Sequence, residues 1–142
     1  MFVESILSSK GGDVYSVATS ATVSELVDML AKHNIGAVLV LDDEGNTAGI
    51  ISERDVVRQL ARASEGIMSK PVSALMTKAL KTCKPTDTLD TVMGIMTRGR
   101  FRHLPVMENG RLVGIISIGD VVKRKIEEVE HETEVLREYI AS

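Results

Sequence analysis

The sequence is poor in the residues that form disulfides, metal centres and stacking surfaces. Its 142 residues include one cysteine, three histidines, no tryptophan, and two each of tyrosine and phenylalanine. A lone cysteine excludes an internal disulfide, and the cysteine and histidines lack the spacing of metal ligands. Apart from Phe101, no aromatic side chain is placed to stack on the bases of a single-stranded nucleic acid.

The chain also lacks a large surplus of either charge and any long apolar stretch. Its 17 basic and 20 acidic residues give a formal net charge of −3, so no general basic field attracts nucleic acid. The longest apolar run, residues 35–41, is far shorter than the ~20 residues that span a bilayer. The N-terminus, with Glu4 near its start, does not resemble a signal peptide. These absences predict a soluble protein of the cytoplasm.

What the sequence does contain is an internal duplication. Residues 49–57 read G-I-I-S-E-R-D-V-V, and residues 114–122 read G-I-I-S-I-G-D-V-V. Upstream of the preceding turn the two copies are offset by one further position, because the first copy has one more residue in that turn. A chain of this length buries roughly 70% of its unfolded surface, which is enough for two half-size units that share a core.

Both copies predict the same order of elements. An extended entry at 14–18 or 79–83 precedes a helix, which in the first copy starts with the capping-box signature Thr22-x-x-Glu25. Two short strands and a second helix follow. The strands are predicted at 37–41 and 47–52 in the first copy and at 103–107 and 111–117 in the second, and the second helices begin near Glu53 and Ile118.

Composition sets the expected domain boundaries. We expect an N-terminal segment at 1–12 with a small helix at 2–7. The first repeat follows at 13–63, a linker rich in small residues at 64–76, and the second repeat at 77–128. Residues 129–142 are then the end of a long C-terminal helix.

The C-terminal helix carries an apolar seam with the spacing of a heptad repeat. Its members are Val122, Ile126, Val129, Thr133, Leu136 and Ile140. Such a seam packs either against the protein's own body or against another chain. Because it extends beyond the second repeat, it favours a homodimer.

The doubled G-I-I-S-x-x-D-V-V and the segment R-F-R-H-L-P-V at 100–106 resemble a tandem pair of CBS domains (cystathionine β-synthase motifs) of the stand-alone bacterial or archaeal type. The resemblance covers about residues 14–128. It implies an α+β fold in which two β-α-β-β-α repeats pack through their sheets, with the C-terminal helix as an extension. It also implies a regulatory module that binds adenine nucleotides and forms a homodimer.

Ser52 and Asp55 in the first copy, and Ser117 and Asp120 in the second, stand where a strand ends and a helix starts. From chemistry alone each pair is a capping box that needs no ligand. The resemblance implies that the serine and the aspartate contact the phosphate and the ribose of a nucleotide. The two interpretations use the same geometry and stay open here.

Basic residues near these caps are candidate phosphate ligands. Arg54 lies in the first turn of a helix, where a cation opposes the helix dipole, whereas Gly119 takes the equivalent position in the second copy. Arg100, Arg102 and His103 belong to a dense basic stretch, and arginine suits phosphate because its fork binds two oxygens. A solvated arginine, a charged loop and a hydrogen-bonded structural histidine are the corresponding alternatives.

The resemblance further implies that the purine lies against the entry strand and the first hairpin strand. The candidates are Ser16, Val17, Ala18, Ile35, Gly36 and Ala37 in the first copy, and Thr82, Cys83, Phe101, His103 and Pro105 in the second. Most of these residues are equally candidates for the core. Cys83 in particular fits a small buried hydrophobic residue.

The sequence assembles no nucleophile with its base, no catalytic carboxylate pair, and no phosphate-binding glycine loop, so we expect no enzyme. We predict a sensor that binds AMP, ADP, ATP or NAD(H) without a metal and controls a partner protein by linkage. The alternatives are a dimerisation scaffold with vestigial pockets, a binder of S-adenosylmethionine, and a binder of nucleic acid. Spacing alone neither ranks the adenosine ligands nor decides how many pockets fill.

Overall fold

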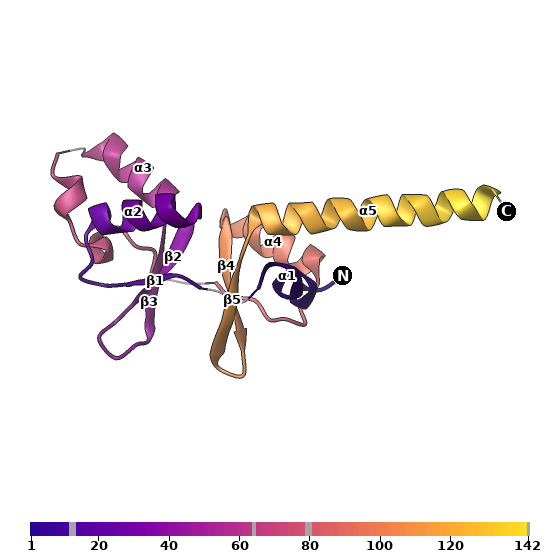
Figure 1. The fold of residues 1–142 in the computed structure, drawn as a ribbon, viewed down its shortest axis with the longest axis horizontal. Helices are drawn as coiled ribbons and strands as arrows, with labels where there is room; N and C mark the ends of the chain where they lie inside the picture. The colour runs from indigo at the N-terminus through magenta and orange to yellow at the C-terminus, as the bar shows by residue number, and fades with distance from the viewer. Residues whose placement is uncertain (12–13, 64, 79–80, 142) are drawn as a thin grey trace. The chain divides into compact units, whose positions relative to one another are not determined.

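The computed structural model describes residues 1–11, 14–63, 65–78 and 81–141. They form two compact units (Figure 1). Unit 1 comprises Met1–Asp13 and Lys81–Ser142, and unit 2 comprises Val14–Leu80. Each unit contains one copy of the duplication, and the α+β fold class predicted from the sequence is confirmed.

Unit 2 is a three-stranded sheet covered by helices. Strand β1 (Ser16–Ala18) pairs in parallel with β2 (Ala37–Leu41), which pairs in antiparallel fashion with β3 (Thr47–Ser52). Helix α2 (Val23–His33) joins β1 to β2, and α3 (Glu53–Arg62) follows β3 directly. The observed order of strands and helices is the one that the first repeat predicts.

Helix α2 begins and packs as its sequence pattern indicates. The side chain of Thr22 accepts a hydrogen bond from the backbone nitrogen of Glu25 at 3.2 Å, which caps the first turn. The apolar residues at helical spacing then face the sheet. Those fully or nearly fully buried are Val23, Leu26 and Leu30.

Unit 1 is a two-stranded hairpin with three helices. The hairpin consists of β4 (His103–Glu108) and β5 (Arg111–Ser117), and α4 (Leu89–Gly99) precedes it. Helix α5 (Ile118–Ala141) follows β5 directly, and α1 (Val3–Lys10) packs beside β5 (Figure 1).

The entry strand predicted for the second repeat is reduced, within the part of the chain that the structure describes, to a single bridge. Cys83 pairs in parallel with Val106, and its backbone nitrogen donates to the carbonyl of Pro105 at 3.0 Å. Residues 79 and 80 of that predicted stretch lie outside the described residues. In the first repeat the entry strand is also shorter than expected, three residues instead of five.

Helix α1 belongs to the core formed by the second repeat, although it precedes the first. Val3 and Ile6 are 0% and 3% exposed and lie in one cluster with residues of α4, β4, β5 and α5. The backbone nitrogens of Val3 and Glu4 donate to the carbonyls of Asp87 and Pro85, both at 3.0 Å. The helix starts one residue later than predicted and ends at Lys10 instead of Leu7, and the ammonium of Lys10 donates to the carbonyl of Ile115 on β5 at 2.9 Å.

The segment predicted as a linker packs in the same way on unit 2. It forms two short 3₁₀ helices, η1 (Ile67–Ser69) and η2 (Val72–Ala74), and Val72 is fully buried. The backbone nitrogen of Val72 donates to the carbonyl of Ala21 at 2.8 Å, as that of Val3 does to Asp87. Val3 and Val72 therefore occupy equivalent places in the two units. The spacing of the repeats does not align this pair, because the first copy has extra residues before its entry strand.

Candidate functional site

In unit 2, the end of β3 and the start of α3 bring a serine and a carboxylate together. Ser52 Oγ accepts from the backbone nitrogen of Asp55 at 3.3 Å. Asp55 Oδ2 accepts from the backbone nitrogen of Ser52 at 2.9 Å and from its hydroxyl at 3.1 Å. The capping box predicted here is confirmed. Among the described residues no group donates to Asp55 Oδ1, so this half-buried carboxylate keeps an open acceptor.

The backbone at the start of β2 lies beside this cap. Ala37 pairs with Ser52 across the antiparallel ladder. The backbone nitrogen of Glu53 donates to the carbonyl of Gly36 at 2.9 Å. The start of β2 and the Ser52–Asp55 cap, which are separate in the sequence, therefore meet at one place. The exposed Arg54 lies in the first turn of α3. Ile35 lies just before and packs partly into the core of unit 2.

The register of β1 separates the other residues predicted for this site. Val17 and Ala18 pair with Val40 and Leu41, at the end of β2 away from Ala37. Because a strand advances about 3.3 Å per residue, Ala18 lies ~13 Å along the sheet from the level of Ala37. The structure therefore does not bring Val17 and Ala18 next to the Ser52–Asp55 cap. Ser16 pairs with Leu39 and lies nearer.

Tyr15 is a candidate that the sequence analysis missed. It immediately precedes β1, and its carbonyl accepts from the backbone nitrogen of Leu39 at 3.1 Å. Its ring stacks on the imidazole of His33, with centroids 4.0 Å apart and planes 25° apart, and it is 37% exposed. An aromatic residue directly before the entry strand, in a chain with few aromatic residues, is the signal that could have revealed it.

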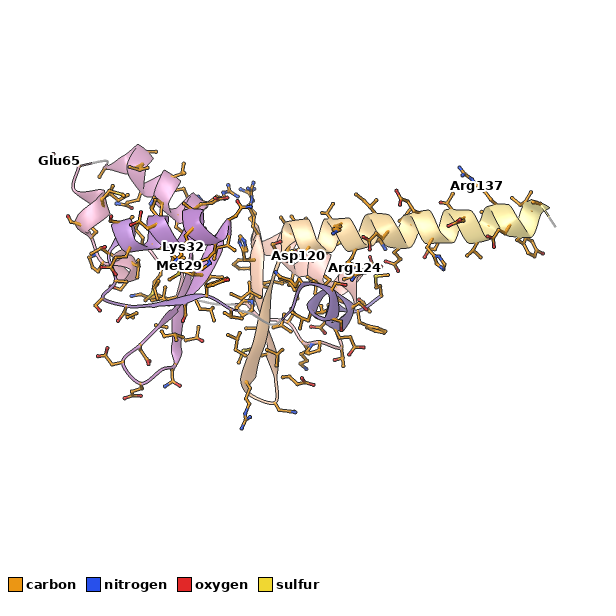
Figure 2. All side chains as sticks on the ribbon, viewed as in Figure 1. Met29, Lys32, Glu65, Asp120, Arg124 and Arg137 are labelled. Atoms are coloured by element: carbon orange, nitrogen blue, oxygen red, sulfur yellow. The ribbon has the colours of Figure 1, made fainter. Side chains whose placement is uncertain are left out.

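Unit 1 repeats the cap with one addition. Asp120 Oδ2 accepts from the backbone nitrogen of Ser117 at 2.9 Å, and Ser117 Oγ accepts from that of Asp120 at 3.1 Å. The ammonium of Lys10 lies 2.8 Å from the same Oδ2 and donates to the carbonyl of Ile115 at 2.9 Å. Figure 2 shows Asp120 at the start of α5, with α1 close by. This carboxylate is therefore ion-paired within its own unit.

The surroundings of Asp120 favour its charged form. Burial alone raises the pKa of this carboxyl, but hydrogen bonds from Lys10 and from the Ser117 backbone, together with the charge of Lys10, outweigh it and lower the pKa. Asp120 is therefore an anion at neutral pH, and Lys10 is its counter-ion. In the part of the chain that the structure describes, no lysine lies against Asp55 in this way.

The backbone beside the second cap is that of Arg102 and His103. His103 pairs with Ser117, and the backbone nitrogen of Ile118 donates to the carbonyl of Arg102 at 2.8 Å. His103 thus takes the place that Ala37 has in unit 2, and Arg102 takes the place of Gly36. Gly119 is exposed in the first turn of α5, so this cap has no counterpart of Arg54.

Arg100 and Phe101 serve the end of α4. Arg100 is the left-handed C-cap residue, with φ of 57°, where α2 has Asn34 with φ of 52°. Asparagine tolerates this conformation better than arginine does. The Phe101 ring lies directly over Gly99 and against the core of unit 1, so it is a packing residue.

The remaining predicted residues lie at a distance from the second cap. Cys83 and Pro105 are buried, and Cys83 is opposite Val106, ~10 Å along β4 from His103. Burial, and secondarily the charge of Asp87, raises the pKa of the Cys83 thiol to about 12, so the thiol stays protonated. Thr82 is exposed and lines a cavity of about 400 Å³ near the turn of the hairpin.

Two kinds of site are missing from the part of the chain that the structure describes. No three histidine, cysteine or acidic side chains there gather to hold a metal ion. No described helix combines the length and the apolar surface needed to cross a membrane. The caps with their neighbouring backbone are the arrangement that recurs in both units.

Comparison with known families gives one match that spans most of the chain. The model of the family described as CBS domain matches residues 3–62 and 72–127. The two matched segments begin at Val3 and Val72, the equivalent buried valines of the two units.

Solved structures resemble the chain over nearly its whole length. A CBS-domain-containing protein from Agrobacterium tumefaciens is 48% identical, with a TM-score of 0.85 over 87% of this chain and 92% of that one. A protein from Burkholderia ambifaria, described as a putative signal-transduction protein with CBS domains, is 36% identical, with a TM-score of 0.85 over 89% and 95%. The CBS domain pair of protein MJ0100, solved with 5′-methylthioadenosine and S-adenosyl-L-methionine, shares the fold at 24% identity, a TM-score of 0.78, and 90% and 98% coverage.

Proposed function

Because this chain belongs to the CBS domain family, we propose that it is a regulatory module whose two serine–aspartate caps bind the ribose of an adenosine compound. One observation supports this most directly. Asp55 is half-buried, is held by Ser52, and keeps its Oδ1 open beside the backbone of Gly36 and Ala37. Its role in the cap uses only one of the two carboxylate oxygens.

The chemistry of a ribose matches such a group. Its two neighbouring hydroxyls both donate, and a carboxylate is the side chain that accepts from both at once. Hydrogen bonds to a charged acceptor contribute about 1.5–3 kcal/mol each, more than neutral ones. The Tyr15 ring, already stacked on His33 and partly exposed, offers an aromatic face for the base.

Phosphate is the expected companion of the ribose. The N-terminus of α3 is positive because of the helix dipole, and Arg54 adds a cation to its first turn. This favours AMP, ADP, ATP or NAD(H) over an uncharged nucleoside at the first cap. The MJ0100 pair was solved with two adenosine-containing ligands, which supports an adenosine compound here and keeps S-adenosylmethionine as the second candidate.

Titration calorimetry with AMP, ATP, NADH and S-adenosylmethionine tests the proposal. We expect at least one of them to bind, and saturation at 100 times the dissociation constant to raise the free energy of unfolding by about 2.7 kcal/mol. If none binds and none shifts the unfolding temperature, the chain is a dimerisation scaffold with vestigial pockets. Tight, salt-steep retention on RNA instead would favour a binder of nucleic acid.

We further propose that the two caps bind unequally. Lys10 lies 2.8 Å from Oδ2 of Asp120, the oxygen that also serves the cap, so its ammonium offsets part of the negative charge that would hold ribose hydroxyls. Among the described residues no lysine pairs with Asp55 in this way. The ion pair is partly exposed, with side chains 38% and 27% accessible, so it weakens the second cap without closing it. The first cap is therefore the tighter site.

The replacement Lys10→Met tests this inequality. In a chain that also carries Asp55→Ala, we expect Lys10→Met to raise the affinity for adenosine about two- to fivefold, because it removes the positive charge that offsets the Asp120 carboxylate. Adenosine is the right probe because it has the ribose but no phosphate that Lys10 could attract.

Lys123→Met, in the same Asp55→Ala chain, is the matched control. Lys123 and Asp120 line the same cavity, but the ion pair of Asp120 is with Lys10, so this variant removes a nearby positive charge without removing that pair. Calorimetry should show no gain for this variant. An unchanged or lower adenosine affinity in Lys10→Met would contradict this effect of Lys10.

The signal would pass by linkage. A nucleotide that prefers one conformation shifts the population towards it, and a partner protein in the cytoplasm reads the change. No residue of either cap is given a catalytic role in this proposal.

A further inference from the structure

The C-terminal half of α5 makes no packed contact within unit 1. Every residue from 129 to 141 is exposed. Figure 1 shows this half continuing past α1 and α4 to the C-terminus. An isolated helix of ~12–15 residues is only marginally stable in water, so a helix of this kind needs a partner surface.

The apolar seam predicted from the sequence begins before this half, at Val122, and runs along the exposed side of α5 to Ile140. The exposed fractions along the seam are 41% for Val122, 53% for Ile126, 48% for Val129, 57% for Leu136 and 75% for Ile140. The alternative in which the seam packs against unit 1 is therefore wrong. Five exposed apolar side chains in one heptad stripe are the pattern of an unpartnered coiled-coil face.

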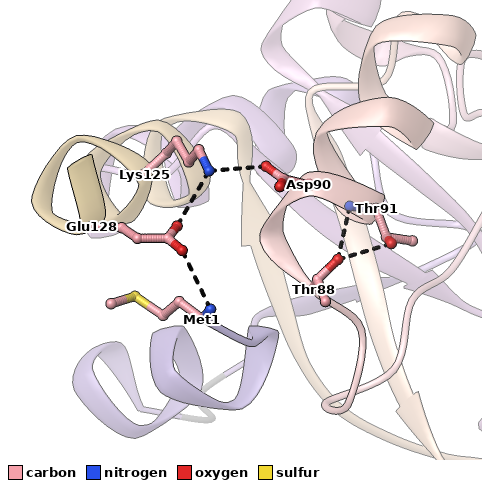
Figure 3. A network of polar contacts seen from close by, with 6 residues as sticks. All are labelled: Met1, Thr88, Asp90, Thr91, Lys125 and Glu128. Carbon is pink, nitrogen blue, oxygen red and sulfur yellow. Dashed lines mark hydrogen bonds and ion pairs between the residues drawn. The ribbon is translucent and has the colours of Figure 1, made fainter. Parts of the chain in front are cut away.

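A different face holds α5 on unit 1. Val121 is fully buried, and Lys125 binds Asp90 at 3.0 Å on α4. Glu128 lies 3.6 Å from the amino group of Met1 (Figure 3). The seam residues Val122, Ile126 and Val129 each follow one of these contact residues by one position. Their side chains therefore point in a different direction around the helix. It can therefore receive a partner without displacing unit 1 contacts.

The residue types in the seam are compatible with a two-stranded assembly. Val122, Val129 and Leu136 take the d positions of the heptad, and Ile126 and Ile140 take a positions. Branching at the β carbon at a, combined with leucine at d, favours two strands, and Leu136 is the d residue that completes this combination. Val122 and Val129 are branched themselves and do not discriminate in favour of two strands. Thr133, at the remaining a position, is also branched and adds a polar group that favours a single register.

Charges beside the seam select the orientation. In a parallel pair, a g residue of one helix meets the e residue five positions later on the other. Lys125 then faces Glu130 of the second copy, and Glu132 faces its Arg137. Both pairs are of opposite charge. Lys125 also binds Asp90 within its own chain, whereas Arg137 projects from the exposed half of α5 (Figure 2). The pair of Glu132 with Arg137 should therefore contribute more to the stability of the dimer.

An antiparallel pair would bring like charges together. There, e residues meet e residues and g residues meet g residues. Glu130 would face Glu130, Glu132 would face Glu132, and Lys123 would face Arg137. Each such contact is repulsive, so the charge pattern disfavours this arrangement as well as favouring the other.

We propose that two copies of the chain associate through residues 122–140 of α5 as a parallel, in-register, two-stranded coiled coil. The proposal depends on α5 alone and is independent of the ligand at the caps. Folding of the exposed half is then coupled to association, so its helicity depends on protein concentration.

Charge reversal tests the pairing. We expect Arg137→Glu to raise the dissociation constant of the dimer about threefold to tenfold in sedimentation equilibrium, because it places two acidic side chains opposite each other on both sides of the seam. The double replacement Glu132→Arg with Arg137→Glu restores opposite charges and should return most of the affinity. Both changes lie on the exposed surface, so unit 1 should fold as before.

Disulfide trapping tests the orientation. In a parallel pair the two Ile140 positions face each other, so Ile140→Cys should form a linked dimer under mild oxidation. Glu138→Cys, at an outward f position, is the matched control and should remain unlinked. The native Cys83 is buried and does not interfere.

Three results would overturn the proposal. A monomer at all concentrations excludes the coiled coil. Equal weakening by the single and the double charge variant excludes the pairing of Glu132 with Arg137. Cross-linking of Ile140→Cys only when Val122→Cys is present on the other copy means that the helices are antiparallel.

Discussion

Replacing Asp55 with alanine is expected to weaken binding of AMP at least about a hundredfold. The reason is the loss of a charged acceptor for two ribose hydroxyls, each worth about 1.5–3 kcal/mol. Asp120→Ala should have a smaller effect, because Lys10 already offsets part of the charge of that carboxylate. Titration calorimetry of the two single variants measures both effects on the same scale.

The loss of a helix cap must be separated from the loss of a ligand contact. Asp55→Ala leaves the backbone nitrogen of Ser52 without its acceptor, which destabilises the start of α3 by about 1 kcal/mol. Thr22→Ala removes the equivalent cap of α2 in the same unit and is the matched control. It should lower the unfolding temperature slightly and leave AMP binding intact. Equal AMP affinity in Asp55→Ala and the unchanged chain would remove the basis of the ribose assignment.

Placing an aspartate at Val3 is expected to lower the free energy of unfolding by about 4 kcal/mol or more. Val3 is 0% exposed in the core of unit 1, and a buried carboxylate without a partner is among the most destabilising single changes. The effect should appear in α4, β4 and β5, which surround Val3, although this residue precedes the first repeat in sequence. Amide hydrogen exchange, followed residue by residue, locates the loss of protection.

Val72→Asp is the matched change for the other unit. Val72 is equally buried and occupies the equivalent place, so it should deprotect α2, β2 and β3 instead. Ser8→Ala, on the exposed face of α1, should change neither pattern. Loss of protection around β2 and β3 in Val3→Asp would mean that α1 packs on the first repeat after all.

The order of helices and strands was predictable because it depends on short-range spacing. Alternation and helical periodicity placed the hairpins correctly, and threonine and serine caps marked where four of the helices begin. Where the prediction was less accurate, longer-range contacts decide the outcome. Helix α1 extends to Lys10, whose ammonium donates to the carbonyl of Ile115 on β5.

The candidate site was predictable in its caps and less so around them. The Ser52–Asp55 and Ser117–Asp120 pairs are three residues apart, so sequence alone brings each pair together. Val17 and Ala18 do not join the first cap, because the register of β1 on β2 is set by packing of the whole sheet. Tyr15 was missed for the same reason.

The sequence by itself determined the duplication, the order of elements in each copy, the two caps and the heptad seam of α5, because each depends on residues close together in the chain. Only the tertiary structure decided that Val3 and Val72 fill equivalent cores, that the seam is exposed, and that Lys10 pairs with Asp120 across 110 positions. Contacts over such separations result from the packing of complete elements against one another. Local spacing cannot specify them, because the same helix can place its lysine against many different surfaces.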